Sequence, residues 1–386
     1  MKNRFNFVSR NSFFLGLVSL LNDAAGGIIV SALPLFLVSL GISPAGIGFM
    51  EGFAEGFSNI LKGFAGFVED KIEDKKKTAL AGYSLTTITR IMYIPAQSFA
   101  FVFGIRILDR FGKAVREPAR DALLAYSSDG KSLGKSFGLQ RAMDTMGGII
   151  GPLFATLVLF FQPKNFILLF VLAFIFSILS LFNFFAIKNA KVKIETKGNN
   201  ILKSAKFRLF LLFTFIFALG NLPIVLLLLR VKDLGGAAYL VPLMFFVYNI
   251  SYAIFLFVAG ILGDILKEAK VIIFGLIIGI MSLFVFAVSA NLLFLGLSFV
   301  LYGIFSGFTD TGTKALVGRV VEKEHFASSY GVVSGLSGLG LILSGGIGGY
   351  VWQQFSPFYA LSLASLFLLV GLLVFILSFM KSPNYE

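Results

Sequence analysis

Long apolar stretches follow one another along almost the whole chain, separated by short polar segments. A membrane-spanning helix needs about 20 mostly apolar residues to cross roughly 30 Å of hydrocarbon at about 1.5 Å per residue. Strands of a membrane β-barrel would instead alternate apolar and polar residues over about ten positions. The pattern therefore predicts an all-α membrane protein with twelve transmembrane helices, at 12–39, 45–69, 78–97, 99–125, 134–161, 165–187, 208–231, 237–263, 271–289, 292–317, 326–352 and 357–380.

A polar segment rich in lysine separates the sixth predicted span from the seventh. We therefore predict an N-terminal six-helix bundle over 1–187, a basic cytoplasmic linker over 188–207 and a C-terminal six-helix bundle over 208–386. Composition supports the membrane assignment, since 57% of the residues are hydrophobic and only 14% are charged. A soluble domain averages about 25% charged residues and has no way to cover so much apolar surface.

The net charge of +13 comes from lysines and arginines that gather in alternate loops. That distribution is the positive-inside bias of cytoplasmic loops, so we predict a multi-pass protein of the inner (cytoplasmic) membrane with both termini in the cytoplasm. It does not indicate a nucleic-acid partner. The chain has no cysteine and one histidine, His325, so we expect no metal site, and no motif indicates a cofactor.

Two unlike motifs recur at nearly the same distance along the chain. The motif Gly66-x-x-x-Asp70-Lys71 is matched by Gly260-x-x-x-Asp264, with the second aspartate 194 residues after the first. A second set recurs after 193 residues, so one six-span unit occurs twice in parallel orientation. This set pairs Gly138, Gly147 and Gly151 with Gly331, Gly340 and Ser344.

The first of these motifs resembles the loop between the second and third spans in the major facilitator superfamily. The resemblance implies two bundles related by a pseudo-twofold axis, which open alternately to the two sides of the membrane. In that family the loop acid contacts basic residues at the inner end of the fourth span, and a carboxylate beside a guanidinium makes a breakable latch. The latch residues that this implies here are Gly66, Asp70, Lys71, Arg116, Arg120 and, in the second copy, Asp264.

The fifth predicted span carries Gly138-x8-Gly147-x3-Gly151-Pro152, which is similar to the antiporter motif of the same superfamily. In that family the motif marks exporters. The same glycines and proline could also be ordinary packing devices, because small residues let helices approach closely. Along nearly its whole length the chain resembles bacterial facilitators of the permease and efflux type.

Ten of the charged residues inside predicted spans of the N-terminal half are candidates for a charge network or a functional site. Each would cost at least about 2.5–3.5 kcal/mol at the bilayer centre if it faced lipid, so we expect them to face one another or a wet cavity. Asp23, Glu51 and Glu55 have no basic residue within one helical turn, and we predict that they couple transport to protons or ions. The remaining candidates for a charge network or substrate site are Arg90, Arg106, Asp109, Arg110, Lys113, Arg141 and Asp144, with Asn221 and Asn249 from the C-terminal half.

Three interpretations of these charges stay open. One or more acids titrate during the cycle, since a change of partner changes the pKa of a buried carboxyl. Alternatively all ten form static salt bridges, in which Asp109 and Asp144 pair with arginines one turn away. Thirdly, Arg90, Arg106 or Arg141 binds an anionic substrate directly, because a guanidinium matches carboxylate and phosphate geometry.

The sequence thus predicts a monomeric secondary transporter whose partners are a small organic or amphipathic solute, a coupling ion and the lipid bilayer. Proton-coupled efflux is the first expectation, and ion-coupled uptake or transport of lipid or metal by the same fold is the alternative. No nucleotide-binding or catalytic motif is present in the sequence, so energy must come from a gradient. A multi-span membrane enzyme or a receptor is the rival from another class.

Overall fold

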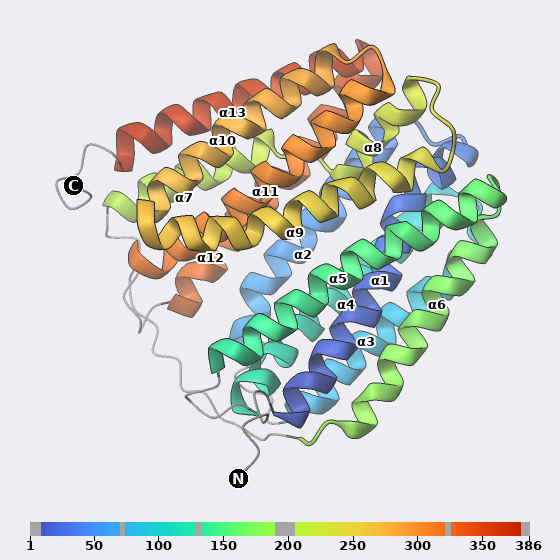
Figure 1. Ribbon diagram of the computed structural model, residues 1–386, viewed down its shortest axis with the longest axis vertical. Coiled ribbons are helices and arrows are strands. Elements are labelled where there is room, and N and C mark those ends of the chain that lie inside the picture. The colour runs from blue at the N-terminus through green and yellow to red at the C-terminus, as the bar shows by residue number, and fades with distance from the viewer. Residues whose placement is uncertain (1–8, 70–73, 128–132, 190–204, 321–325, 380–386) are drawn as a thin grey trace, which may run out of the picture.

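The computed structural model consists of long helices that run roughly side by side (Figure 1). It describes residues 9–69, 74–127, 133–189, 205–320 and 326–379, and these contain no strand. The N-terminal helices are α1 (Arg10–Ser39), α2 (Pro44–Glu69), α3 (Lys75–Met92), α4 (Phe99–Tyr126), α5 (Leu133–Phe161) and α6 (Phe166–Phe182), followed by the short η1 (Asn183–Ala186). The others are α7 (Ala205–Gly220), α8 (Ile224–Asp233), α9 (Leu240–Leu266), α10 (Glu268–Val288), α11 (Leu292–Val320), α12 (Phe326–Gln354) and α13 (Pro357–Phe379).

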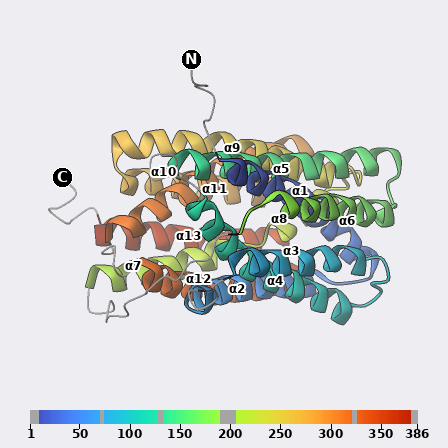
Figure 2. The same cartoon turned by 90° about the horizontal axis from the view of Figure 1, so that it is seen from below.

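The helices form two bundles, α1–α6 and α7–α13, that repeat the same packing (Figures 1 and 2). In the first bundle α1 packs on α5 and α6, and α3 packs on α4 and α6; in the second, α7 packs on α12 and α13, and α10 packs on α11 and α13. Between the bundles, α2 packs on α12 and α5 on α9, which are equivalent pairs under a pseudo-twofold axis. The predicted fold class is confirmed, while the exact domain limits stay a prediction.

The seventh predicted span, expected as one continuous helix, is instead the pair α7 and α8. The chain leaves the helix at Asn221 because Pro223 has no backbone N–H and its ring blocks the preceding turn. The freed polar groups find partners, as they must within a membrane. The Asn221 carbonyl accepts a hydrogen bond from Ser344 Oγ at 3.1 Å, and its side-chain oxygen accepts one from Tyr302 at 2.7 Å.

The first and last described helices, α1 and α13, begin and end on the same side of the molecule, called here the terminal face (Figure 1). At the opposite face the bundles share one apolar core. Leu37 of α1, Ile47 of α2, Leu226 and Leu228 of α8 and Val241 of α9 are all fully buried in it. Because this core joins helices of both bundles, the molecule is packed shut at the opposite face.

Nine helical segments of the described chain are apolar enough to cross a membrane by composition alone, and α2, α3 and α4 are not among them. These three helices carry intramembrane charges, so they are stabilised by polar partners inside the protein. Outside the membrane, Asp74 begins α3 as its N-cap. The backbone N–H of Lys77, which donates to the Asp74 carboxylate, holds the pKa of that group below its ordinary value.

Candidate functional site

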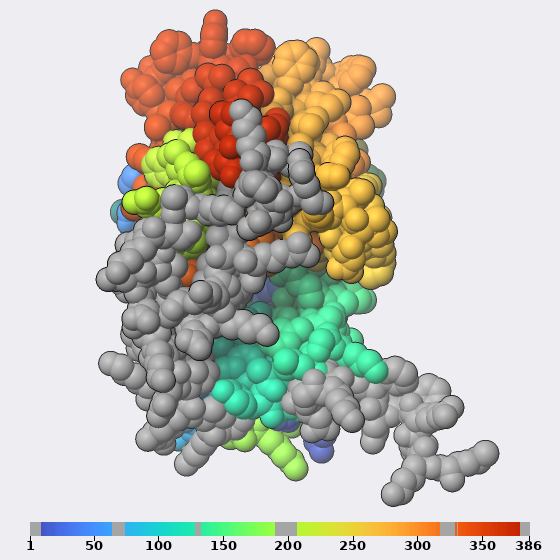
Figure 3. Space-filling model, turned by 90° about the vertical axis from the view of Figure 1, so that its left-hand side faces the viewer, coloured from blue at the N-terminus to red at the C-terminus, as the bar shows by residue number. Residues whose placement is uncertain are grey.

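Two neighbouring cavities lie between the bundles. The larger, of about 530 Å³, is lined by α2, α7, α9, α11 and α12 and is called here the aromatic cavity. The smaller, of about 260 Å³, is lined by α1, α3, α4, α5 and α9 and is called the arginine cavity. In the space-filling view α5, in teal, lies directly below α9, in yellow, and atoms of deeper helices are visible beside them (Figure 3). The interior therefore has the space that a central transport site needs.

The most deeply buried ion pair joins α2 to α4. Arg106 Nε and Nη2 donate to the two carboxylate oxygens of Glu51 at 2.6 and 2.5 Å, and both side chains are at most 3% exposed. On the other side Asp109 accepts from Arg90 of α3 at 2.9 Å. Since Arg106 also lies 3.7 Å from Asp109, these four residues form a continuous chain of alternating charge.

The acid of the next turn of α2 stands at the boundary between the cavities. Glu55 accepts a hydrogen bond from Arg110 Nη2. The Glu55 side chain is 39% exposed and lines the aromatic cavity, whereas Arg110 lines the arginine cavity. Glu55 is thus paired like Glu51, but solvent and solute in the cavity can reach it.

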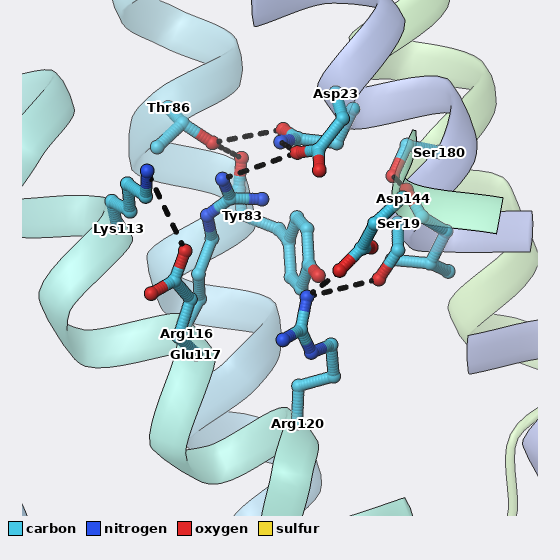
Figure 4. Close-up of polar contacts among 12 residues, drawn as sticks. Ser19, Asp23, Tyr83, Thr86, Lys113, Arg116, Glu117, Arg120, Asp144 and Ser180 are labelled. Carbon is cyan, nitrogen blue, oxygen red and sulfur yellow. Dashed lines mark hydrogen bonds and ion pairs between the residues drawn. The ribbon is translucent and has the colours of Figure 1, made fainter. Parts of the chain in front are cut away.

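Asp23 of α1 faces the arginine cavity and has a looser partner (Figure 4). Its carboxylate lies 3.8 Å from Arg116 Nη2, and its side chain is 35% exposed. Arg116 lies over the ring of Tyr83, 4.6 Å from its centroid. With its carboxamide oxygen turned to the guanidinium, Asn22 accepts from Arg116 at 2.9 Å. Asp23 therefore shares Arg116 with two other groups.

Arg120, one turn further along α4, connects three helices (Figure 4). It donates to Ser19 of α1 at 3.1 Å and lies 3.6 Å from Asp144 of α5. Asp144 also accepts from Gln140 at 2.6 Å. Asp144 is therefore paired as expected, but with Arg120 of another helix and not with Arg141 on its own helix.

Arg141 instead reaches across to the C-terminal bundle. Its Nη2 atom donates to Asp310 of α11 at 2.7 Å and to the hydroxyl of Tyr252 of α9 at 2.6 Å. Tyr252 donates to the same Asp310 oxygen at 2.8 Å, and Lys314 lies 3.0 Å from the other. We call Arg141, Tyr252, Asp310 and Lys314 the gate cluster. The sequence analysis placed the charge network and the coupling acids in the N-terminal half and missed this link. Asp310 was a signal for it, because it lies in a largely apolar half.

The predicted latch is described only in part. Gly66 lies within α2, while Asp70, Lys71 and His325 lie outside the described residues. Asp264, near the end of α9, is exposed. The described partners of Arg116 and Arg120 are the residues given above. Because Asp70 is not described, the latch stays a prediction.

The glycines of the fifth span have different roles. Gly147 and Gly151 lie against the backbone of α1, and Pro152 contacts Gly27. The equivalent Gly340 lies against Phe215 and Ala218 of α7, which shows the same packing in both repeats. A Cβ at Gly138 would meet nothing within 4 Å, so close packing does not explain this position. Asn249 of α9 lines the arginine cavity, and Asn221 lines the aromatic cavity.

A second row of glycines joins the bundles, and the sequence analysis named only one of its members, Gly331, as part of the repeat. It runs along the contact between α2 and α12, where backbone meets backbone with no room for side chains. Its signal was a repeated spacing of four or seven residues, which places glycines on one helical face. We call it the glycine seam: Gly48, Gly52, Gly56 and Gly63 of α2 with Gly331, Gly338, Gly345 and Gly349 of α12.

Two repeated helix bundles that are packed together at one face and enclose a polar, charged cavity define a membrane transport protein. The Major Facilitator Superfamily model matches this chain twice, over residues 15–220 and 208–386. The chain belongs to this superfamily, which confirms the resemblance seen in the sequence.

Relatives and solved structures agree with this assignment. An uncharacterized MFS-type transporter of Methanocaldococcus jannaschii is 31% identical over 360 residues, covering 90% of this chain and 89% of the relative. The quinolone resistance protein NorA of Staphylococcus aureus is 32% identical over 45% of this chain and 42% of its own length. The crystal structure of a mutant of the nucleoside transporter NupG has a TM-score of 0.81 at 16% identity, covering 95% of this chain and 99% of that one. A POT family transporter in complex with 5-aminolevulinic acid has a TM-score of 0.82 at 12% identity, covering 100% and 98%.

Proposed function

We propose that this chain is a proton-coupled secondary transporter that carries a small organic or amphipathic solute by alternating access. The observation that carries the proposal is that Asp23 and Glu55 each combine exposure to a central cavity with a single arginine partner on α4. Protonation of either carboxyl weakens its ion pair and releases the guanidinium. A proton taken up from one side thereby changes the contacts between α4 and its neighbours.

Glu51, the third acid predicted from the sequence, has a different environment. It is buried, holds Arg106 through two hydrogen bonds and is not among the described residues that line either cavity. Protonation would break the close pair and leave the buried Arg106 guanidinium with only the more distant Asp109 as a charged partner, which is costly. We therefore propose Asp23 and Glu55 as the coupling acids and give Glu51 a structural role.

Two directions of transport follow from different observations. Export in exchange for protons is supported by the glycine motif of α5 and by the partial similarity to the quinolone resistance protein NorA. Uptake together with protons is supported by the arginine partners themselves, because a proton on Asp23 or Glu55 frees a guanidinium for a negatively charged solute. We propose export as the first candidate and uptake as the second.

The coupling proposal can be tested without knowing the solute. Infrared spectra of the protein in lipid nanodiscs, recorded from acid to alkaline pH, should show a protonated carboxyl band that disappears as the pH rises. Asp23→Asn and Glu55→Gln should each remove part of this band, because each variant removes one titrating group. Glu51→Gln should leave the titrating part unchanged. A band that survives in the Asp23→Asn, Glu55→Gln double variant would show that other groups titrate.

Vesicles with an imposed pH gradient separate the two directions. The probes are naphthalene-1-sulfonate and the (1-naphthylmethyl)trimethylammonium ion, whose charges do not change with pH. Exchange for protons predicts that a probe loaded inside leaves faster when the outside is acidic. Transport with protons predicts that an external probe enters faster under the same gradient. If the wild-type flux does not depend on the pH gradient, both directions of proton-coupled transport are contradicted.

A further inference from the structure

The charges that face the arginine cavity are mostly positive. Its lining contains five basic side chains and two acidic ones, Asp23 and Asp109. The acids that pair with Arg106 and Arg110 do not line this cavity: Glu51 is not among the described lining residues of either cavity, and Glu55 lines the aromatic cavity. A negatively charged group in the cavity therefore meets the positive ends of these pairs first. The basic lining residues are Arg90, Arg106, Arg110, Lys113 and Arg116.

Two cations on this wall lie farther from their nearest acid than a charge-assisted hydrogen bond requires, although Arg116 also donates to Asn22. Lys113 lies 3.7 Å from Glu117, and Arg116 lies 3.8 Å from Asp23. Charge-assisted hydrogen bonds are typically about 2.7–2.9 Å long, so neither contact uses the donor fully. The wall thus has more donor capacity than its own acids satisfy.

A row of aromatic rings leads from this wall into the aromatic cavity. Phe245 of α9 lines the arginine cavity, and its ring is stacked on Tyr248 at 5.8 Å between centroids. Tyr248 is stacked in turn on Tyr252 at 6.2 Å, and both tyrosines line the aromatic cavity together with Tyr302. The volume of that cavity, about 530 Å³, is within the range of roughly 300–1,000 Å³ for small-molecule sites.

We propose that the two cavities form one binding site for an amphipathic organic anion. Its acidic group lies in the arginine cavity against Lys113, Arg110 and Arg116, and its aromatic or apolar body lies along Phe245 and Tyr248. The inference rests on the proposed transport function but not on its direction. It names a class of solute for this chain, which the fold by itself does not determine.

Removal of the Glu55 charge should have opposite effects on the affinity for an anion and the affinity for a cation. This acid shares Arg110 with the site for the anion, so the two negative groups compete for one guanidinium. Glu55→Gln should therefore strengthen the binding of an anion. A site for a cation would lose affinity in the same variant, because it would lose an attractive charge.

The test compares three probes that share a naphthalene ring and differ in charge: naphthalene-1-sulfonate, the (1-naphthylmethyl)trimethylammonium ion and the neutral 1-naphthalenemethanol. Dissociation constants are measured by equilibrium dialysis on the full chain in nanodiscs of zwitterionic lipid. Since a hydrogen bond to a charged group contributes about 1.5–3 kcal/mol, we expect the sulfonate to bind at least about tenfold more tightly than the cation. Glu55→Gln should raise the sulfonate affinity roughly fivefold, and Lys113→Gln should lower it by a similar factor.

Matched variants show whether the effects are specific. Lys164→Gln removes an exposed lysine in the loop before α6 and should leave the sulfonate affinity unchanged. Lys113→Arg keeps the charge and should retain it. Neither Lys113→Gln nor Glu55→Gln should alter binding of the neutral probe, whereas Tyr248→Ala should weaken both the neutral probe and the sulfonate.

Equal or tighter binding of the cation overturns the proposal, and so does weaker sulfonate binding in Glu55→Gln. The two proposals can fail separately. Selective sulfonate binding without a titrating carboxyl band would retain the anion site and refute proton coupling. A titrating band that is lost in Asp23→Asn, without selectivity for the sulfonate, would retain proton coupling and refute the anion site.

Discussion

At the scale of single residues, the three acids predicted from the sequence differ in their partners. Glu51 is held at two points by Arg106, Glu55 shares Arg110 at the edge of a cavity, and Asp23 lies farther from its arginine. Burial and hydrogen bonding favour one fixed charge state, while exposure to a cavity permits exchange of a proton. The same residue type therefore supports structure at one position and can support coupling at another.

Glu51→Gln should destabilise the protein strongly, because it leaves Arg106 as an undercompensated charge in a buried site. Breaking a buried ion pair by removing one partner costs about 3–5 kcal/mol. Unfolding in detergent, followed by circular dichroism, measures the effect. Asp264→Asn, at an exposed position of α9, is the control and should unfold like the wild type. A stable Glu51→Gln variant would argue against the structural role of Glu51.

At the scale of elements, the glycine seam determines how closely the bundles meet along α2 and α12. Without side chains the two backbones approach closely, and helices gain van der Waals contact along their whole length. A smooth surface of this kind would also allow one helix to tilt on the other in the proposed alternating-access cycle. The break between α7 and α8 acts at the same scale, since it exposes Asn221 to the aromatic cavity.

Gly56→Ala should impair both stability and transport, because its Cβ would collide with the carbonyl oxygen of Gly338. The collision involves backbone on both sides and can be relieved only by separating the helices. Gly260→Ala in α9 is the matched control, since a Cβ there meets nothing within 4 Å. In an open helical position alanine is favoured over glycine by about 1 kcal/mol, so the control should be at least as stable as the wild type. Equal thermal stability of both variants would contradict the role of the seam.

At the scale of the whole molecule, the gate cluster links the two bundles on the terminal-face side of the membrane centre. Arg141 lies in the third turn of α5, which begins at the terminal face, and Asp310 lies about three turns before the end of α11 on that face. The apolar core closes the opposite face. Besides the glycine seam, the bundles are thus joined by an apolar contact at one end and by a hydrogen-bonded ion pair nearer the other, and the ion pair is the easier of these two to exchange.

Asp310→Asn should shift the conformational equilibrium toward separation at the terminal face, because Arg141 loses its charged partner. The chain has no cysteine, so spin labels can be attached at Lys135→Cys on α5 and Asp264→Cys on α9. Double electron–electron resonance should show a larger long-distance population in the Asp310→Asn variant. Asp121→Asn, which removes an acid contacting Arg120 within the N-terminal bundle, is the control and should keep the wild-type distribution. Identical distributions in all three proteins would show that the cluster does not hold the bundles together.

The sequence alone determined the number and position of the spans, the repeat and the superfamily. These depend on the length of apolar stretches and on motifs that recur at fixed distances, which are properties of the chain read in order. It also identified ten charges of the N-terminal half, since a charge inside an apolar stretch is evident without a structure. Pro223 gave a local signal for the break of the seventh span that the hydropathy pattern obscured.

Only the tertiary structure decided which charges meet. Asp144 pairs with Arg120, Arg141 with Asp310, and Glu51 with Arg106, and every one of these contacts crosses from one helix to another. Spacing along a helix shows which residues share a face, but the rotation of that face toward a neighbour depends on how all the helices pack. The glycine seam and the two cavities also depend on helix packing, because each is formed by residues of several helices. They could therefore be recognised only in the tertiary structure.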